Sequence, residues 1–345
     1  ALKIKIIRTY NVHYKEIHHL LQAITELKNE EPDFEMYVML GAWIDCKNAW
    51  TDENPDHNQE SEQNEGEIER AVALANQYPE IVKILAVGNE AMVRWATSYF
   101  VQPSVILKWV NHLQSLKSEG KLPKELWITC SDDFSSWGGA DSSYHTEDLA
   151  KLVKAVDYIS LHTYPYHNTH YNPAFWFVPE DQSQKSDIEK IDAAMLRSKD
   201  FAKMQYDSVA NYVKSLGVEK PIHIGETGWA SESDGFYGSE GSRATDEYKQ
   251  GLYYKHMREW TSAAGISCFY FEAFELVTDQ LRDYMYFKDD GAHPNQKAID
   301  VVWAYFQQSL MDASTRTILE EWGALQKSKA HHILYPESRE AQQLQ

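Results

Sequence analysis

Two glutamates each end a short apolar run of the sequence. Glu90 closes the segment ILAVGNE and Glu226 closes PIHIGE. A glutamate after a strand is often a surface charge or the start of a helix, but the same context twice, with a glycine nearby, favours a shared site. Two carboxylates facing each other can cleave an acetal, one as proton donor and one as nucleophile, and a retaining reaction places them about 5–5.5 Å apart.

The elements that would position these carboxylates alternate between strand and helix. Short apolar runs bounded by polar residues or glycine predict strands, and apolar residues spaced three and four apart predict helices. The expected strands are residues 3–10, 35–43, 82–88, 125–131, 156–164, 221–226 and 265–274. The expected helices are residues 13–28, 66–77, 104–118, 146–155, 202–216 and 244–263.

This rhythm predicts an α/β fold, a (β/α)8 TIM barrel whose first βα unit is missing or supplied elsewhere. If residues 3–10 form the second barrel strand, the two glutamates follow strands four and seven, on opposite sides of the mouth. We expect a catalytic barrel over residues 1–310 and a peripheral helix and tail over 311–345, with a weak strand signal at 331–336. Residues 45–66 and 165–200 interrupt the rhythm and are expected to be loops at the carboxyl ends of strands.

The composition limits the partners. The formal net charge is −19 and no run of basic residues is present, so nucleic acid is a poor partner. A neutral glycan would not be repelled. No apolar stretch is long enough to span a membrane. The first residues lack the features of a signal peptide, as a processed chain would, which favours a secreted or periplasmic protein. We expect a monomer with no cofactor.

Cysteine and histidine show no metal-binding pattern. Cys46, Cys130 and Cys268 are far apart and predict buried free thiols. Histidines cluster at 18–19, 162–170 and 331–332, which keeps a metal-dependent barrel hydrolase open as an alternative. However, the chain contains no HExxH motif, and the first predicted strand carries no HxH. We therefore expect no metal.

Five motifs at predicted strand ends extend the two-glutamate pattern: MLGAW, VGNE, HTYPY, GETGW and FEAF. Together they resemble glycoside hydrolase family 17, the β-1,3-glucanases and related glucan transglycosylases, and in particular its bacterial branch. The resemblance runs in order from about residue 4 to about residue 276. It implies a retaining enzyme that cleaves laminarin-type β-1,3-glucan through a glycosyl-enzyme intermediate.

The resemblance also implies roles for individual residues. Glu90 would be the general acid/base and Glu226 the nucleophile. Asn89 would bind the sugar 2-hydroxyl, Arg8 would hold Glu226 ionised, and Tyr10 would line the reacting subsite.

Further residues are expected to bind substrate. Tyr164 matches the family's tyrosine beside the nucleophile, and Glu272 matches a family glutamate. Aromatic planes pack against the C–H faces of sugars, so Trp137, Trp176 and Trp229 are the expected subsite residues among the aromatics that follow strand ends, which also include Trp43, Trp50 and Trp95. After FEAF the chain departs from the family pattern of Asp-Glu-Pro-Trp and continues with the residues Glu-Leu-Val-Thr of 275–278.

Two alternative readings of the same residues stay open. A β-glucan transglycosylase would use the same two glutamates and pass the sugar to another glycan. A non-catalytic glucan-binding barrel would keep the aromatics. Endo and exo cleavage are not separated, although the long segments 45–66 and 165–200 lean towards a blocked, exo-like site.

Overall fold

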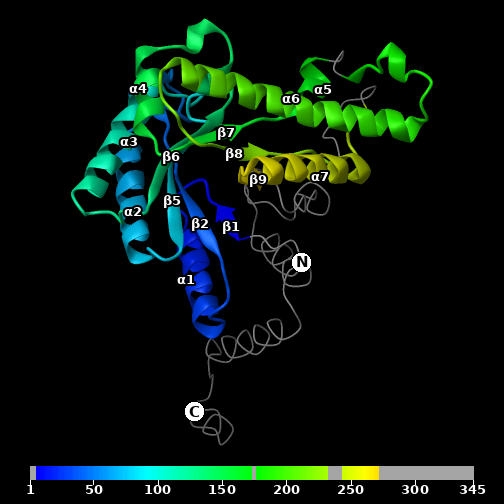
Figure 1. The fold of residues 1–345 in the computed structure, drawn as a ribbon. Coiled ribbons are helices and arrows are strands. Elements are labelled where there is room, and N and C mark those ends of the chain that lie inside the picture. Colours follow the sequence, from blue (N-terminus) through cyan, green and yellow to red (C-terminus); the bar gives the residue numbers. More distant parts are fainter. Residues whose placement is uncertain (1–4, 173–175, 232–242, 272–345) are drawn as a thin grey trace, which may run out of the picture. The chain divides into compact units, whose positions relative to one another are not determined.

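Seven parallel strands form the main sheet of the computed structural model, which describes residues 5–172, 176–231 and 243–271 (Figure 1). These residues belong to one compact unit, residues 3–273. The strands follow one another in sequence order, and every neighbouring pair is parallel. Their bounds are β1 Ile6–Arg8, β2 Tyr37–Ala42, β5 Val82–Asn89, β6 Trp127–Asp133, β7 Ile159–His162, β8 Ile222–Thr227 and β9 Cys268–Tyr270.

The sheet curls into a nearly closed barrel, which confirms the predicted fold class. The two edge strands approach each other at their carboxyl ends, where the rings of Tyr10 and Phe271 meet edge to face with centroids 6.5 Å apart. Across the interior, the hydroxyl of Tyr158, the residue just before β7, donates to the Met39 sulfur on β2 at 3.6 Å. A contact between strands this far apart in the sheet requires the sheet to curve back on itself.

Helices cover the outer face of the barrel (Figure 1). Outward-facing strand residues such as Leu40, Leu85 and Leu161 pack with the apolar stripes of the helices in one buried core. The helix bounds are α1 Lys15–Glu30, α2 Gln63–Gln77, α3 Pro103–Ser118, α4 Glu147–Ala155, α5 Asn168–Tyr171, α6 Asp187–Ser215 and α7 Glu247–Ala264. All seven predicted strands and all six predicted helices are present, with shifted ends.

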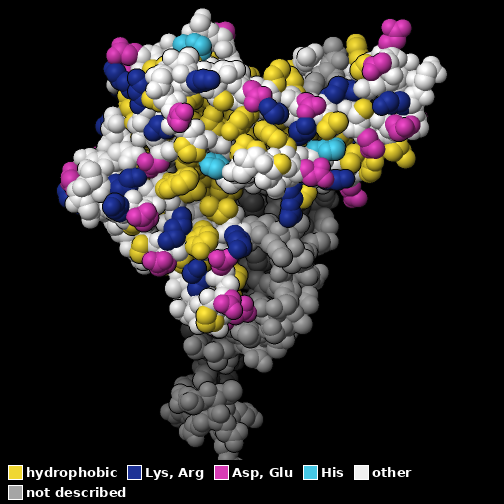
Figure 2. Space-filling view, in the orientation of Figure 1, with side chains coloured by type: hydrophobic (Ala, Val, Ile, Leu, Met, Phe, Trp, Pro, Cys, Tyr) yellow, Lys and Arg dark blue, Asp and Glu magenta, His cyan; other side chains and the backbone are white. Residues whose placement is uncertain are grey.

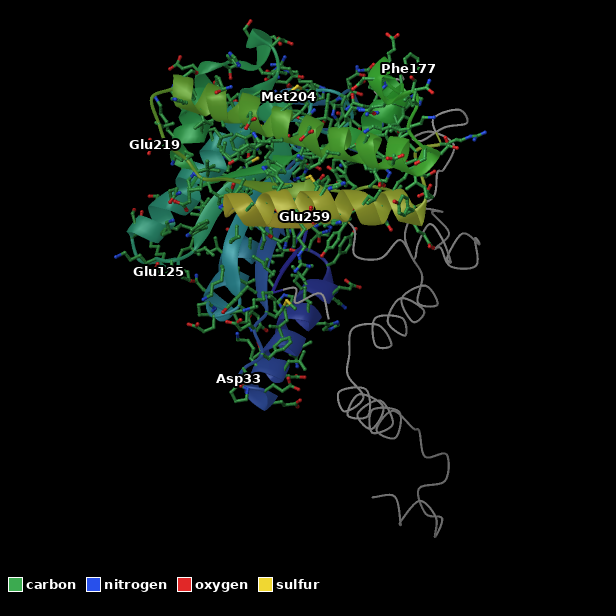
Figure 3. The ribbon with its side chains drawn as sticks, turned by 45° about the vertical axis from the view of Figure 1, so that its right-hand side comes forward. Asp33, Glu125, Phe177, Met204, Glu219 and Glu259 are labelled. Atoms are coloured by element: carbon green, nitrogen blue, oxygen red, sulfur yellow. The ribbon has the colours of Figure 1, made fainter. Side chains whose placement is uncertain are left out.

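The largest difference from the expected elements is at α6. Residues 165–200 were expected to be a loop, but α6 begins at Asp187 and is 29 residues long. A capping box starts it: the Ser186 side chain accepts from the Glu189 backbone N–H, and the Glu189 side chain accepts from the Ser186 backbone N–H. The signal Ser-x-x-Glu was in the sequence, but the charged composition of the segment obscured it. The exposed Met204 lies on this helix (Figure 3).

The segment after β2 is also more ordered than expected. Residues 45–66 contain a small antiparallel hairpin, β3 Cys46–Lys47 with β4 Asp56–Glu60, and the start of α2. This hairpin lies beyond the carboxyl end of β2, on the side of the barrel where the two glutamates lie. By contrast, Glu125 and Glu219 come just before β6 and β8, near the amino ends of the strands (Figure 3).

The remaining expectations concern the surface and the termini. Figure 2 shows acidic and basic side chains interspersed over the visible face of the described residues. None of the helices in the described part of the chain is long and apolar enough to cross a membrane. Cys46 and Cys130 are buried free thiols, whereas Cys268 is only partly buried. The predicted strand at 331–336 and the boundary at residue 310 lie outside the described residues and stay predictions.

Gly225 on β8 gives a test of how tightly the barrel is packed beneath the site. A Cβ atom there would lie 2.0 Å from the Ser160 hydroxyl and 2.8 Å from that of Ser131. We expect Gly225→Ala to lower the free energy of unfolding by ~1–3 kcal/mol through overpacking. Gly251→Ala on α7 is the control: nothing lies within 4 Å of its Cβ, so it should raise stability by ~0.5–1 kcal/mol. Urea unfolding measures both, and an unchanged Gly225→Ala protein would contradict the tight packing.

Candidate active site

Glu90 is turned into the mouth of the barrel by an irregularity at the end of β5. The register with β6 shifts between Ala86 and Asn89. Gly88 and Glu90 both have positive φ, 81° and 46°, and left-handed backbone is unfavourable for a side chain as large as glutamate. A hydrogen bond of 2.9 Å from the Glu90 N–H to the Ser131 carbonyl on β6 holds this conformation. The backbone conformation at the end of β5 therefore directs the Glu90 carboxylate into the mouth of the barrel.

Glu226 lies at the corresponding end of β8, and the two carboxylates meet. Oxygen atoms of Glu90 and Glu226 and a ring nitrogen of His162 all lie within 4.8 Å of one another. Inverting glycosidases separate their carboxyl groups by ~6.5–9.5 Å to admit a water, whereas retaining enzymes keep them at ~5–5.5 Å. The two carboxylates therefore approach more closely than those of an inverting pair.

Arg8, at the end of β1, connects these groups. Its Nη1 donates to Glu226 Oε2 at 2.9 Å and to the Gly225 carbonyl at 2.8 Å, and it lies 3.0 Å from His162 Nε2. Its Nη2 donates to Asn89 Oδ1. The expected contact between Arg8 and Glu226 is therefore present, and one cation joins the carboxyl ends of four strands.

Two tyrosine hydroxyls complete the surroundings of Glu226. Tyr10 donates to Oε2 at 3.1 Å and Tyr164 donates to Oε1 at 2.6 Å. Burial raises the pKa of Tyr164 well above its usual value, and the charge of Glu226 raises it further. Tyr164 therefore keeps its proton and acts as a donor. A guanidinium and two hydroxyls pointing at one carboxylate favour its ionised form.

His162 was not among the expected site residues, although it begins the HTYPY motif. It is fully buried, and burial lowers its pKa to about 3, so the ring is neutral. Its Nε2 lies against Arg8, which can only donate, and 2.8 Å from the Ser131 hydroxyl. Nε2 is thus the acceptor, and Nδ1 carries the proton and donates to Glu90 Oε1 at 3.0 Å.

Glu90 has different electrostatic surroundings from Glu226. Burial raises the pKa of Glu90, while the positive charges of His167 and Arg8 act in the opposite direction. The net shift is upwards, so Glu90 holds its proton at a higher pH than an exposed glutamate does. A carboxyl group that stays protonated in a cleft can act as a general acid.

Asp132, also missed from the sequence, supports the turn that follows Glu90. Its carboxyl group is fully buried at the end of β6 and accepts a 2.8 Å hydrogen bond from the Met92 N–H. Burial raises the pKa of Asp132 well above its usual value. This contact fixes the backbone two residues after Glu90. The sequence signal is the pair of aspartates at the end of a predicted strand.

Two of the three tryptophans expected to bind sugar are buried in the core. Trp137 is 0% exposed, and its indole N–H donates to the Ser160 carbonyl at 3.0 Å. Trp229 is 2% exposed, and its N–H donates to the Ala244 carbonyl at 2.9 Å. Both pack in the core and present no open ring face to a sugar. Trp176 is half-buried beside Trp229, and Glu272 lies outside the described residues, so their roles stay predictions.

The described residues include one cluster with the ligand types of a metal site, Glu90, His162 and Glu226. However, both nitrogens of His162 already have partners, and Arg8 places a fixed positive charge on Glu226. A divalent cation would have to compete with that charge. The arrangement suits proton transfer and nucleophilic attack better than metal binding.

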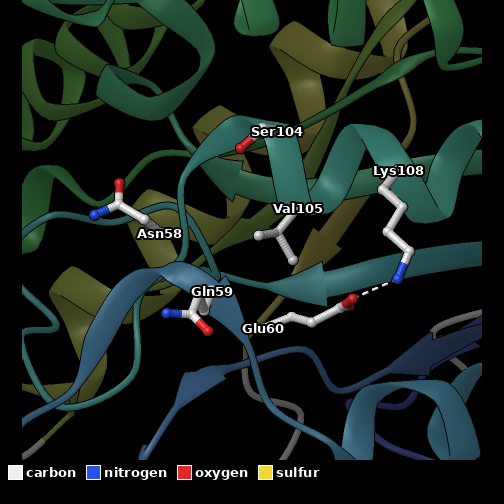
Figure 4. A pocket seen from close by; sticks show the side chains of 6 residues that line it. All are labelled: Asn58, Gln59, Glu60, Ser104, Val105 and Lys108. Carbon is white, nitrogen blue, oxygen red and sulfur yellow. Dashed lines mark hydrogen bonds and ion pairs between the residues drawn. The ribbon is translucent and has the colours of Figure 1, made fainter.

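A separate surface pocket lies between β4 and α3 (Figure 4). Glu60 forms an ion pair there with Lys108 and accepts from the Trp109 indole N–H at 2.6 Å. The pocket contains none of the site residues. It is lined by Asn58, Gln59, Glu60, Ser104, Val105 and Lys108.

Comparison with known proteins agrees with this fold. The BtgE/BtgC glycoside hydrolase domain matches residues 1–282, so the chain belongs to this family and is a glycoside hydrolase. A crystal structure of an endo-laminarinase from Formosa Hel1_33_131 is 62% identical, with a TM-score of 0.79 over 81% of this chain and 71% of that one. A β-1,3-glucanosyltransferase mutant from Rhizomucor miehei, in complex with laminaritriose, shares the fold at 18% identity, with a TM-score of 0.52 over 85% of this chain and 84% of that one. No curated protein sequence matched the chain.

The neutral state of His162 can be tested directly. We expect its ring to remain neutral with the proton on Nδ1 from pH 5 to pH 8, because burial holds its pKa near 3. Long-range 1H–15N spectra of protein labelled at histidine would show this tautomer, with the resonance assigned by its absence in His162→Asn. An imidazolium signal at pH 5, or a proton on Nε2, would contradict the hydrogen-bond directions given above.

Proposed function

We propose that the protein hydrolyses β-1,3-glucan of the laminarin type with retention of configuration, with Glu226 as nucleophile and Glu90 as general acid/base. The observation that carries the proposal is the approach of the two carboxylates to within 4.8 Å, one beside Arg8 and the other against the neutral His162. The 62% identity with an endo-laminarinase supports the substrate and favours endo cleavage over the exo-like site expected from the long loops. The five motifs support membership of glycoside hydrolase family 17.

In the first step Glu226 attacks the anomeric carbon, and the glycosidic bond breaks as Glu90 gives its proton to the leaving oxygen. A glycosyl-enzyme ester and a shortened glucan result. In the second step the ionised Glu90 takes a proton from water, which attacks the same carbon and releases Glu226. Two displacements restore the original configuration.

The surrounding residues divide the work between these steps. Arg8, Tyr10 and Tyr164 hold Glu226 ionised and aimed. His162 occupies one oxygen of Glu90, which leaves the other for the leaving group. Asn89 accepts from Arg8 through its oxygen, so its amide nitrogen serves as donor to the sugar 2-hydroxyl, a contact that strengthens in the transition state.

Product analysis tests the reaction itself. Time courses on β-1,3-, β-1,4- and mixed-linkage glucans should show cleavage of the β-1,3-linked substrate first, with products of intermediate length. NMR of the initial products should show the β-anomer. Products longer than the starting oligosaccharide would indicate transfer to sugar instead of hydrolysis, and initial α-anomer would rule out retention.

Removal of the nucleophile should abolish turnover. Glu226→Ala cannot form the glycosyl-enzyme, so we expect kcat to fall by ~10⁴-fold or more. Azide should partly restore the release of an aryl leaving group by attacking from the vacated side. Glu125→Gln is the control, because Glu125 is exposed near the amino end of β6, and it should keep full activity. Substantial activity of Glu226→Ala without azide would refute the assignment.

The pH profile tests Glu90. A general acid must be protonated, so kcat/KM should fall as pH rises through the pKa of Glu90, which burial places above the usual value for glutamate. Glu90→Gln should remove this alkaline limb and slow laminarin hydrolysis by ~10²–10⁴-fold. Aryl laminarioligosides with good leaving groups need little acid assistance and should be much less affected in the glycosylation step. Equal losses on both substrates would show that Glu90 is not the acid.

A further inference from the structure

Two loops at the carboxyl ends of β2 and β5 bring three aromatic rings together. The loops are joined by a 3.0 Å hydrogen bond from the Cys46 N–H to the Tyr99 carbonyl. The Tyr99 ring contacts two indoles: its centroid lies 5.6 Å from that of Trp43, with the rings tilted by 46°, and 5.0 Å from that of Trp50, with the rings nearly parallel at 22°. None of the three rings takes part in the catalytic contacts described above.

Trp50 is exposed and conformationally strained. Its φ is 62°, and that of Asn48 is 63°. Left-handed backbone at a bulky residue costs ~1–3 kcal/mol and is concentrated at functional sites. Burial does not offset this cost, because Trp50 is 62% exposed. Since Tyr99 covers one face of the indole, the exposed surface includes the other face.

Asp45 holds the edges of both indoles. Its carboxylate accepts from the Trp43 indole N–H at 3.4 Å. Burial raises the pKa of Asp45, and hydrogen bonds from Trp43, Ser61 and Trp50 counteract that rise. The Asp45 backbone N–H in turn donates to Asn64 Oδ1 at 3.2 Å. The Trp50 ring is thus fixed at its edge by Asp45 and at its inner face by Tyr99.

The aromatic group extends outward from the catalytic carboxylates. Burial raises the pKa of Tyr99 strongly, and the negative charges of Glu90, Asp132 and Glu226 raise it further. The Tyr99 hydroxyl therefore lies within electrostatic reach of the catalytic pair, while Trp50 stacks on its ring at the solvent side.

We propose that Trp50, backed by Tyr99 and held by Asp45, is a stacking platform for a glucosyl residue outside the cleavage position. This subsite rests on the proposed function, which makes a β-linked glucan the ligand. A β-linked glucose presents axial C–H groups that pack on an aromatic plane. The platform uses the open face of an indole already fixed in place, so little side-chain entropy is lost when a sugar binds. A neutral sugar is also not repelled by the nearby carboxylates.

Trp50→Ala tests the platform through the Michaelis constant. Stacking is worth ~0.5–1.5 kcal/mol, so KM for laminarihexaose should rise ~3- to 10-fold. The kcat should change less than ~2-fold, because the platform does not touch the reacting atoms. The increase in KM should grow from laminaritriose to laminarihexaose, and Trp50→Phe should keep most of the wild-type affinity. Calorimetric titration in the Glu226→Ala background should show the same loss of hexaose affinity without turnover.

Trp127→Ala is the matched control. Trp127 is also exposed, at 45%, but it begins β6 and so lies at the opposite end of the barrel. The KM of the Trp127→Ala variant should therefore equal that of the wild type. An unchanged KM in Trp50→Ala, or a loss confined to kcat, would overturn the platform while leaving the proposed function in place. If folded Glu226→Ala protein with Trp50 intact bound no β-1,3-glucan oligosaccharide, the proposed substrate would fail as well. Circular dichroism checks the fold of each variant.

Discussion

The ion pair between Arg8 and Glu226 is the contact on which the site depends. Both side chains are largely buried, 5% and 12% exposed, so neither charge is well solvated. A buried charge is stable only when its partner and further hydrogen bonds are in place. Arg8, at the end of β1, meets this condition by contacting the ends of β5, β7 and β8 at once. Strand β1 is therefore held at the site by the Arg8–Glu226 ion pair as well as by its backbone hydrogen bonds to β2.

The same contact separates the two carboxylates chemically. Glu226 is surrounded by donors, a guanidinium and two tyrosine hydroxyls, and these stabilise negative charge. Glu90 is partly buried against a neutral histidine, and burial favours its protonated form. Two identical side chains a few ångströms apart thus differ in how strongly their neighbours favour the ionised form, which supports the opposite roles that we propose for them. His162 contacts both halves, because one nitrogen faces Arg8 and the other faces Glu90.

The sequence was informative where a residue's position follows from strand periodicity. Parallel strands end at the same edge, so the meeting of Glu90 and Glu226 could be predicted from two apolar runs. The contact of Arg8 with Glu226 was instead expected from the family resemblance. Burial of individual tryptophans could not be predicted, because the same residue type follows strand ends whether its side chain faces the cleft or the core. Trp137 and Trp229 turn inward, and Trp50 stays outside. The first half of α6 was missed although its capping box was visible and its apolar residues Ile188, Ile191 and Met195 recur at three- and four-residue spacing. Its many charged residues led us to expect a loop.

Backbone strain at the carboxyl ends of the strands links the catalytic centre to the surface beside it. Glu90 and Trp50 are both large residues with positive φ. Each is held by a neighbouring loop or strand: Glu90 by the Ser131 carbonyl on β6, and Trp50 by the ring of Tyr99 and the carboxylate of Asp45. A strained conformation persists only where its surroundings determine it. The parallel sheet supplies that support beneath the mouth, where Gly225, Ser131 and Ser160 are too tightly packed to admit one more carbon atom. This layer includes Ser131, whose carbonyl holds the strained backbone of Glu90 and so directs its carboxylate into the mouth of the barrel. Trp50 is instead held by the contacts of its own loop with Tyr99, and its indole faces solvent.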